Sequence, residues 1–442
     1  MHRLAAVATG LALALSAAAQ SADRSATTAN AATANKVVVL KAAHLFDGRS
    51  GQLVSPGIVV VEGERIAAVG IGAAIPAGAR VVDLGDATLV PGFIDAHTHL
   101  TMDHNDDWAK GFYEGMLRFP VEQSFHAGRN ARATLQAGVT SARDVGSNDF
   151  IDVALRNAIN DGLTEGPRML VAGHAIGSTG GHCDSSPIPP DVMKPSGTLE
   201  GVCNGPEQCR LAVREQMKYG ADVIKICASG GVLSESDPVD VPQLTPEELR
   251  AIIGEAHSWR RKTAAHAHGD LAAKQAVEAG IDSIEHGSFL TVPTLQLMKQ
   301  KGVYLVPTRM TQVWVNKKAD TYPAKIAGKA RAAAAAHTEM FKNALKVGVP
   351  IAFGTDAAVF PHGMNAEEFG DMVDLGMTPA GALMTSSQGS AKLLGIDAET
   401  GTLEAGKFAD IVAVPGDVLQ NIRATEKPVM VMKHGRNVQL SQ

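Results

Sequence analysis

The residues of this 442-residue chain best able to do chemistry are His97 and His99, which end the apolar run 89–96. On a β-strand, residues two apart project from the same face, so both imidazoles can reach one point in space. Neutral imidazole is a common nitrogen ligand for zinc and similar divalent ions. Taken alone, the pair fits equally well a half-buried strand with two hydrogen-bonded histidines. The elements around it must decide between these interpretations.

The middle of the chain alternates strand-like with helix-like segments. The candidate strands are 92–99, 139–144, 168–172, 222–227, 263–268, 282–286, 303–307 and 350–356. Helical patterns such as 246–261, 271–279 and 330–347 lie between them, and several end at a glycine that can cap a helix. This order predicts a parallel (β/α)8 barrel of the TIM type. An open doubly wound sheet is the alternative, but its first strand should lead into a glycine-rich phosphate loop, where this chain has His-Thr-His.

A barrel gathers the carboxyl ends of its strands at one rim, where barrel enzymes carry their chemistry. Ligand-type residues end five of the candidate strands: His97 and His99, Lys225, His266 and His268, Glu285 and His286, and Asp356. Each has an ordinary structural explanation when considered alone, such as a core histidine, a paired lysine or an aspartate that caps a helix. Their joint occurrence predicts a metal site.

Lys225 needs a separate explanation, because an ammonium group has no lone pair to offer a metal. Burial disfavours the charged form of lysine and lowers its pKa. A neutral amine can take up carbon dioxide to give a carbamate. Such an anionic group with two oxygens is suited to bridging the two metals of a hydrolase.

The segment 91–99, together with Lys225, His266, His286 and 354–356, resembles the amidohydrolase superfamily. The match extends from about residue 36 to the C-terminus and includes the late segment 401–410. Segments 173–182 and 265–269 are similar to the imidazolonepropionase-related branch of prolidases and carboxypeptidases, which includes bacterial amidohydrolases that hydrolyse ochratoxin A. The resemblance implies a TIM-like barrel with a small β-sandwich domain built from both chain ends.

The domain boundaries follow from the β-rich ends and the export signal. Arg3, a short apolar core and Ala17-Ala18-Ala19 predict a signal peptide over 1–19 and an exported protein, while a membrane anchor is the alternative. Residues 20–35 form a predicted disordered leader rich in Ala, Ser, Thr and Asn. We expect the β-sandwich domain to comprise 36–90 and 401–442, with the metallohydrolase barrel over 91–400.

The resemblance implies roles for the ligand-type residues. It assigns His97, His99, carbamylated Lys225 and Asp356 to a first divalent metal. Lys225 would also bridge to a second metal, held by His266 and His286. Zinc is expected at both positions, although manganese, cobalt and iron accept the same ligand set. A hydroxide between the metals would attack the substrate carbonyl, and Asp356 would pass the proton to the leaving nitrogen.

Further residues are candidates for substrate contact. His268 is expected to donate to the substrate carbonyl or carboxylate and to act as a catalytic group, the alternative being a partner of a carboxylate in the protein. His182, in a glycine-rich loop, is expected to contact an anionic group, the alternative being a plain surface histidine. The remaining candidates are Ser229, Gly230, Arg309 and His362.

The function predicted from these residues is metal-dependent hydrolysis of an amide bond to a C-terminal amino acid. The substrate would be an N-acyl amino acid or a dipeptide, with ochratoxin A as one candidate. A cyclic-amide hydrolase or deaminase is the alternative, although deaminases of this fold usually lack the strand-4 lysine that is present here as Lys225. An exported, non-catalytic binding protein with a vestigial barrel is a third interpretation.

Composition narrows the choice of partners. The net charge is −6 and no basic cluster is present, so we expect no nucleic-acid partner. No segment after the predicted signal peptide is long and apolar enough for a membrane span. The resemblance further implies a homo-oligomer.

Four cysteines are present. Cys227 lies in an apolar run and is expected to be a buried free thiol. One disulfide is expected among Cys183, Cys203 and Cys209, because an exported protein meets oxidising conditions.

Overall fold

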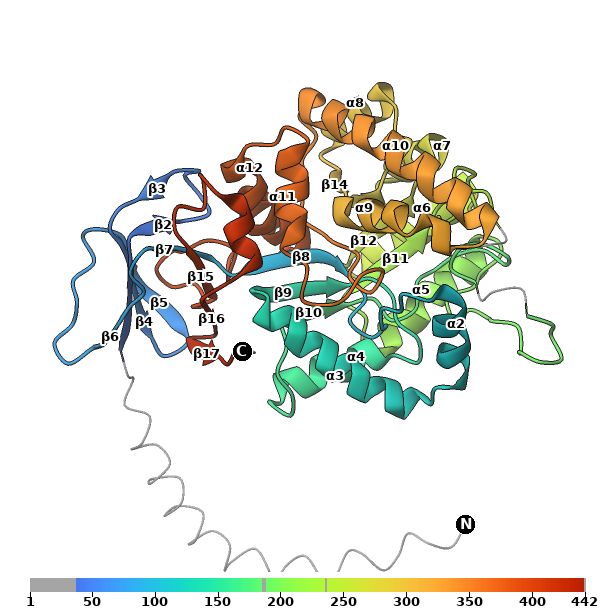
Figure 1. Ribbon diagram of the computed structural model, residues 1–442. Helices are drawn as coiled ribbons and strands as arrows, with labels where there is room; N and C mark the ends of the chain where they lie inside the picture. The colour runs from blue at the N-terminus through green and yellow to red at the C-terminus, as the bar shows by residue number, and fades with distance from the viewer. Residues whose placement is uncertain (1–36, 185–187, 235–236, 441–442) are drawn as a thin grey trace, which may run out of the picture.

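The computed structural model describes residues 37–184, 188–234 and 237–440. The predicted signal peptide and leader therefore lie outside the described residues. Figure 1 shows two parts, a β-rich unit coloured blue and red and a larger α/β part that carries the middle of the chain.

The β-rich unit combines both ends of the chain in two sheets. One sheet has the order β5-β4-β1-β6, formed by β1 (Val38–Ala42), β4 (Gly57–Glu62), β5 (Arg65–Val69) and β6 (Arg80–Asp83). The other has the order β17-β16-β15-β7-β2-β3, formed by β2 (His44–Phe46), β3 (Leu53–Val54), β7 (Ala87–Pro91), β15 (Ile411–Pro415), β16 (Met430–Lys433) and β17 (Arg436–Val438). One apolar cluster draws on both sheets, including Leu40, Val59, Leu89 and Ile411. Such a shared core is what the predicted β-sandwich requires.

The α/β part contains seven regular parallel strands. The first three, β8 (Phe93–Thr98), β9 (Val139–Asp144) and β10 (Arg168–Val171), form one sheet. The next four, β11 (Val223–Cys227), β12 (Lys262–Ala267), β13 (Ser283–His286) and β14 (Tyr304–Val306), form another. Every residue of β8, β9, β11 and β13 is buried, as expected for strands covered on both faces.

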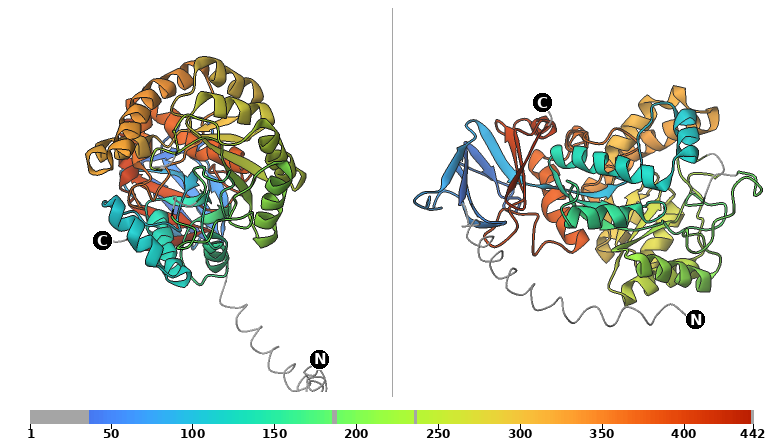
Figure 2. Two further views of the ribbon diagram at one scale, coloured as in Figure 1. Left: turned by 90° about the vertical axis from the view of Figure 1, so that its right-hand side faces the viewer. Right: turned by 90° about the horizontal axis from the view of Figure 1, so that it is seen from below.

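Helices surround these strands, as the left view of Figure 2 shows. They are α2 (Trp108–Leu117), α3 (Pro120–Gln136), α4 (Ile151–Asn160), α5 (Pro206–Tyr219), α6 (Pro246–Ser258), α7 (Asp270–Ala279), α8 (Val292–Lys301), α9 (Arg309–Lys317), α10 (Ala324–Val347), α11 (Glu367–Asp374), α12 (Pro379–Met384) and α13 (Ser390–Leu394). Gly220, Gly280, Gly302 and Gly348 end α5, α7, α8 and α10 with positive φ angles. The predicted glycine caps are thereby confirmed at these four positions.

The predicted eighth strand, 350–356, is not a regular strand. Its backbone nevertheless connects the two sheets, because Ile351 bridges Leu305 of β14 and the Ala96 N–H of β8 donates to the Phe353 carbonyl at 2.8 Å. On the other side, the Asp222 N–H before β11 donates to Val171 of β10 at 2.7 Å. The segment departs from strand geometry where it delivers its functional carboxylate: Gly354 packs on His97, and Asp356 has φ +63°. The strands thus form two parallel arcs with a linking segment, in place of eight regular strands.

The cysteines differ from expectation at one position. Cys227 is not a free thiol, because it forms a disulfide with Cys183, and Cys203 pairs with Cys209. The first pairing is possible because Ile176 bridges Ile226, which brings the loop after β10 beside the end of β11. Cys203–Cys209 is the expected bridge among the other three cysteines.

A search of the described helices finds none with the length and hydropathy needed to cross a membrane.

Candidate metal centre

The two histidines of β8 converge on Asp356. The His97 Nε2 and the His99 Nε2 each lie 3.3 Å from Asp356 Oδ1. The opposite ring nitrogens are engaged by the protein: His97 Nδ1 lies 2.7 Å from Glu285 Oε2, and His99 Nδ1 lies 3.0 Å from the Gly146 carbonyl. These bonds fix the tautomer and leave both Nε2 lone pairs directed at one point, beside a carboxylate oxygen.

A second group comprises His266 and His268 from the end of β12 and its following loop, with His286 from the end of β13. One ring nitrogen from each lies within 4.8 Å of the others. His286 Nδ1 contacts Thr308 Oγ1 at 2.8 Å, His268 Nδ1 contacts Ser288 Oγ at 2.8 Å, and His266 Nε2 lies 3.1 Å from the Gly230 carbonyl. The last contact requires a proton on Nε2 and leaves the His266 Nδ1 lone pair for a cation. By distance alone, His268 is as eligible a ligand as its two neighbours.

The arrangement fits divalent cations. His97 Nε2 is buried and makes no hydrogen bond within the part of the chain that the structure describes. An unpaired polar atom in such a place is costly, and a bound cation would satisfy it. Burial lowers the pKa of His268 to about 3 and holds the pKa of His266 and His286 well below the usual range, so these imidazoles stay neutral, as metal ligands must be.

Asp356 and Lys225 complete this set. Although burial opposes its ionisation, His97 and His99 hold the pKa of Asp356 well below its usual range, so the carboxylate is anionic. Lys225 lies in the middle of β11 and is 3% exposed. Burial lowers its pKa to about 8, against the opposing influence of Glu285 and Asp356. A substantial neutral fraction near physiological pH is the condition for carbamate formation.

The sequence marked Glu285 only as one of the ligand-type residues at the strand ends and gave no role to Arg143. In the structure Glu285 contacts His97 and pairs with Arg143. Arg143 and Glu285 have no exposed surface, and the Arg143 Nη2 donates to Glu285 Oε1 at 2.8 Å. Arg143 also donates to the Ser283 Oγ at 3.2 Å and to the Ala96 carbonyl. Although burial raises it, Arg143 and His97 hold the pKa of Glu285 at about 2. The sequence signal was an arginine inside the candidate strand 139–144, whose neighbouring strands the sequence does not reveal.

His182 and the segment 229–231 lie at the same place. The rings of His182 and His266 have centroids 4.3 Å apart. A Cβ at Gly231 would collide with the His182 ring, so this glycine makes room for it. Ser229 is fully buried and its hydroxyl accepts from the His268 N–H at 2.9 Å and donates to the Gly230 carbonyl at 3.1 Å. The Ser229 side chain therefore holds the backbone at the end of β12, where His266 and His268 lie.

Arg309 and His362 are more peripheral. Arg309 begins α9, and its Nη1 is buried without a hydrogen bond in the described structure. His362 Nε2 lies 2.8 Å from the Met102 carbonyl, and burial lowers its pKa to about 4. Arg309 therefore has an unused donor for an anion, whereas His362 is committed to the backbone of the loop after β8.

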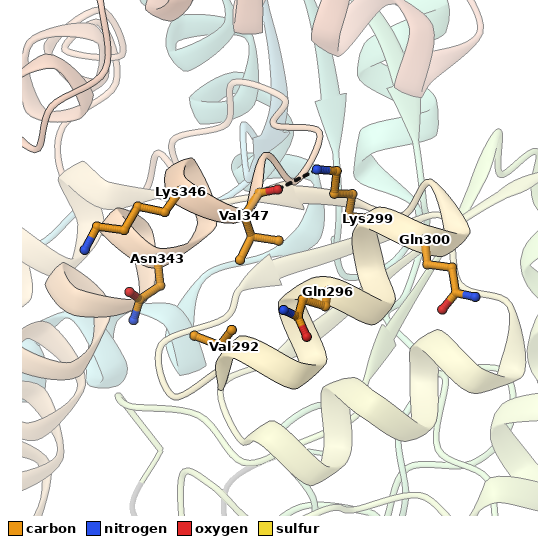
Figure 3. A pocket seen from close by; sticks show the side chains of 7 residues that line it. All are labelled: Val292, Gln296, Lys299, Gln300, Asn343, Lys346 and Val347. Atoms are coloured by element: carbon orange, nitrogen blue, oxygen red, sulfur yellow. Dashed lines mark hydrogen bonds between the residues drawn. The ribbon is translucent and has the colours of Figure 1, made fainter.

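A groove of about 720 Å³ lies elsewhere, on the outside of the α/β part. Figure 3 shows its lining, which comes from α8 and α10 and includes Gln296, Lys299, Asn343 and Lys346. Lys299 of α8 donates to the Val347 carbonyl of α10 at 2.8 Å, which links the two helices. None of the candidate ligands lines this groove, so we place the functional site at the strand ends.

Fold and site together define a metal-dependent hydrolase built on an α/β barrel. Residues 88–438 match the model of the amidohydrolase family, and the chain belongs to that family. A TIM-like barrel is the architecture that this membership implies. It is an enzyme family of hydrolases that use divalent metals.

Particular relatives narrow the comparison. Ochratoxinase of Aspergillus niger is 33% identical over 416 residues, which cover 90% of this chain and 85% of the relative. A crystal structure of a Xaa-Pro dipeptidase with bound methionine is 35% identical, with a TM-score of 0.87 and coverage of 91% of this chain and 99% of that one. A prolidase complexed with N-methylphosphonate-L-proline is 29% identical, with a TM-score of 0.83 and coverage of 92% and 100%.

Proposed function

We propose that this protein is a binuclear amidohydrolase that removes a C-terminal amino acid from an N-acyl amino acid or a dipeptide. The observation that carries the proposal is the proximity of two ligand groups, His97, His99 and Asp356 in one and His266, His268 and His286 in the other, since the His97 and His286 rings lie 5.0 Å apart. Buried Lys225 interacts electrostatically with members of both groups. The relatives support the reaction class, since they include a dipeptidase, a prolidase and an ochratoxinase.

Within this proposal, His97, His99 and Asp356 would hold one divalent ion, and His266 with His286 would hold the other. Lys225, as a carbamate, would supply an anionic ligand to both. Zinc suits the nitrogen-rich ligand set. When bound, the ions supply an activated water at neutral pH and polarise the substrate carbonyl.

The chain's own residues supply the proton transfers and the orientation of the substrate. Asp356 is ionised and solvent-shielded, so it can accept a proton at Oδ2 and return it to the leaving nitrogen. An amine leaves poorly unless it is protonated, so this transfer matters for an amide. His268, whose Nδ1 contacts Ser288, is our candidate donor to the substrate carbonyl oxygen, and Arg309, whose buried Nη1 has no partner in the described residues, is our candidate for binding the substrate carboxylate.

These roles predict that a substrate must carry a free carboxylate. Ochratoxin A, N-acyl amino acids and dipeptides share an amide bond to an amino acid with a free α-carboxylate. We expect the corresponding amino-acid amides, which lack that charge, to be poor substrates, because Arg309 would then face a neutral group.

The test measures metal content and hydrolysis on the full chain. We expect about two ions per chain and turnover of a panel of N-acyl amino acids and dipeptides that includes ochratoxin A. Lys225→Ala should lose metal and activity, and short carboxylic acids should restore part of both by replacing the bridge. Full metal content and full activity in Lys225→Ala would exclude the carbamate, and a metal-free, inactive wild type would exclude the hydrolase.

We also propose that the protein is exported and forms a homo-oligomer. Two disulfides suit an oxidising compartment, in agreement with the predicted signal peptide over 1–19. Large apolar side chains lie exposed along α2 and the start of α3, including Leu117, Phe119, Val121 and Phe125. Contiguous apolar surface of this kind is typical of an interface. N-terminal sequencing of the exported protein should find a start near Gln20.

A further inference from the structure

The candidate site contains a disulfide that takes no part in the proposed hydrolysis. The Cys183–Cys227 disulfide joins the loop that carries His182 to the end of β11, two residues beyond Lys225. The Cα atoms of the two cysteines are 5.8 Å apart, within the range of about 4.4–6.8 Å that disulfides require. Gly177 packs directly on the bridge, since a Cβ there would lie 2.9 Å from that of Cys183.

Hydrogen bonds also hold the loop around His182, and its first residue, Gly177, pairs with the backbone of 201–203. Short-range bonds shape its turn, with the Gly181 N–H donating to Ser178 and the Asp184 N–H to Gly181, each at 3.0 Å. The His182 N–H donates to Gln243 Oε1 at 2.8 Å. The imidazole Nδ1 is buried and has no hydrogen-bond partner in the described residues.

Hydrogen bonds hold the segment on the opposite side of the His182 ring. Lys329 of α10 donates to the Gly231 carbonyl at 2.6 Å, which holds the glycine segment against the His182 ring. His266 lies on the other side of the ring, at 4.3 Å between centroids. The His182 ring therefore lies between the Gly231 segment and the His266 ring. The next residue, Cys183, is linked by its disulfide to the strand that carries Lys225.

We propose that Cys183 and Cys227 are positioning residues of the active site: their disulfide holds His182 over the metal-binding histidines, where it contacts the substrate. The proposal rests on the proposed function for its kinetic part only. The disulfide adds no group to the reaction. It restricts the His182 backbone relative to β11, so that the imidazole is already positioned when the substrate binds.

The chain offers a matched control. Cys203–Cys209 lies nearby, and the Cys203 N–H donates to the Gly177 carbonyl at 2.9 Å, but this bridge joins cysteines only six positions apart at the start of α5 and does not link the loop to β11. Removing it tests the loss of a disulfide as such. The test variants are Cys183→Ala/Cys227→Ala, Cys203→Ala/Cys209→Ala, His182→Ala, and the combination of His182→Ala with the first pair.

The first measurement is hydrogen exchange on the metal-loaded full chain, which needs no substrate. In Cys183→Ala/Cys227→Ala we expect faster exchange over residues 177–184, with metal content unchanged and protection of β11 retained. The Cys203→Ala/Cys209→Ala control should keep wild-type exchange in that loop. Unchanged exchange in the first variant, or equal acceleration in both, would overturn the proposal.

The second measurement is kinetic coupling. We expect Cys183→Ala/Cys227→Ala to lose kcat/KM by an amount similar to His182→Ala, up to about 10²-fold. Since both changes act through one imidazole, the combined variant should be no worse than His182→Ala alone. Multiplicative losses would show that the disulfide acts independently of His182 and would overturn the proposal. If the wild type hydrolyses nothing in the panel, the proposed function fails while the exchange result still decides the role of the disulfide.

Discussion

At the scale of single residues, His97 explains most about how the site is built. Its Nε2 faces Asp356, and its Nδ1 contacts Glu285 at 2.7 Å, which in turn pairs with Arg143. A buried ion pair is not in itself a source of stability. Here it has a geometric use, because it fixes which nitrogen of His97 carries the proton and which carries the lone pair.

Replacing Glu285 tests that use. Glu285→Gln keeps the shape and an acceptor for His97 but removes the charge opposite Arg143, so we expect metal affinity to fall by about 10- to 100-fold. Competition with a fluorescent chelator measures the affinity. Glu165→Gln removes a carboxylate from an exposed ion pair with Arg132 and is the control, with no change expected. Wild-type affinity in Glu285→Gln would show that the carboxylate does not tune His97.

His266 and His268, at the end of β12, call for a direct comparison. Spacing does not decide between them, because both bring a ring nitrogen within 4.8 Å of one on His286. We propose His266 as the ligand and His268 as the substrate contact, which is the assignment that the family resemblance implies. We expect His266→Ala to lose one metal and all turnover. His268→Ala should keep both metals and lose about 10²- to 10³-fold in kcat/KM. Metal analysis beside kinetics separates them, and the reverse pattern would exchange the two roles.

How far single residues could be predicted depended on where their partners lie in the chain. His97, His99, Lys225, His266 and Asp356 were recognisable because each ends a strand and has a ligand-type side chain. Arg143 was not, because its meaning depends on Glu285, which lies 142 residues away on the far side of the strand assembly. Cys227 was misread for the same reason: its partner, Cys183, is brought to it only by the bridge between Ile176 and Ile226.

At the scale of elements, helix ends and strand order followed the local sequence closely. The glycines after α5, α7, α8 and α10 adopt the left-handed conformation that the sequence predicted. The segment 350–356 departed from prediction because its apolar residues and closing Thr-Asp resemble a strand, while Gly354 and the positive φ of Asp356 bend it toward the site. Local patterns do not encode a bend that long-range packing imposes.

The two disulfides should differ in their effect on stability. Their loops span 44 and 6 residues, and the chain-entropy model makes the longer bridge more stabilising by about 2 kcal/mol. We therefore expect Cys183→Ala/Cys227→Ala to lower the free energy of unfolding more than Cys203→Ala/Cys209→Ala does. Urea denaturation of the two variants and the wild type measures the difference. A larger loss for the short bridge would show that strain or denatured-state structure dominates.

A buried glutamate on α11 couples stability to pH. Glu368 accepts from the Arg309 N–H at 2.9 Å and the Met310 N–H at 2.6 Å, and burial raises its pKa to about 8. Because the folded-state pKa lies above the unfolded one, the native state binds the extra proton, and stability falls as pH rises from about 4.5 to 8.

Glu368→Gln removes this titration. We expect the melting temperature of the wild type, relative to that of the variant, to decrease between pH 5 and pH 8.5. Glu339→Gln, an exposed position on α10, is the control. Parallel melting curves for wild type and Glu368→Gln across this range would show that Glu368 is ionised throughout.

At the scale of the whole molecule, the β-rich unit and the α/β part are joined by more than the chain. Arg168 of β10 donates to the fully buried carboxylate of Asp410 at 2.9 Å, and Asp410 also accepts from the His434 N–H at 2.9 Å. Val412 and Val431 pack in the same apolar cluster as Phe93 and Val139. The last strands of the chain are therefore part of the support for β8, which carries His97 and His99.

This closure has a consequence for synthesis. β7 pairs with β15, more than 300 residues later, so the sheet that β7 occupies has an open edge until the final residues leave the ribosome. A chain that lacks residues 409–440 has no β15, β16 or β17 and leaves β7 without its antiparallel partner. Such a truncated chain keeps an open sheet edge, so we expect proteases to remove it faster than the full chain.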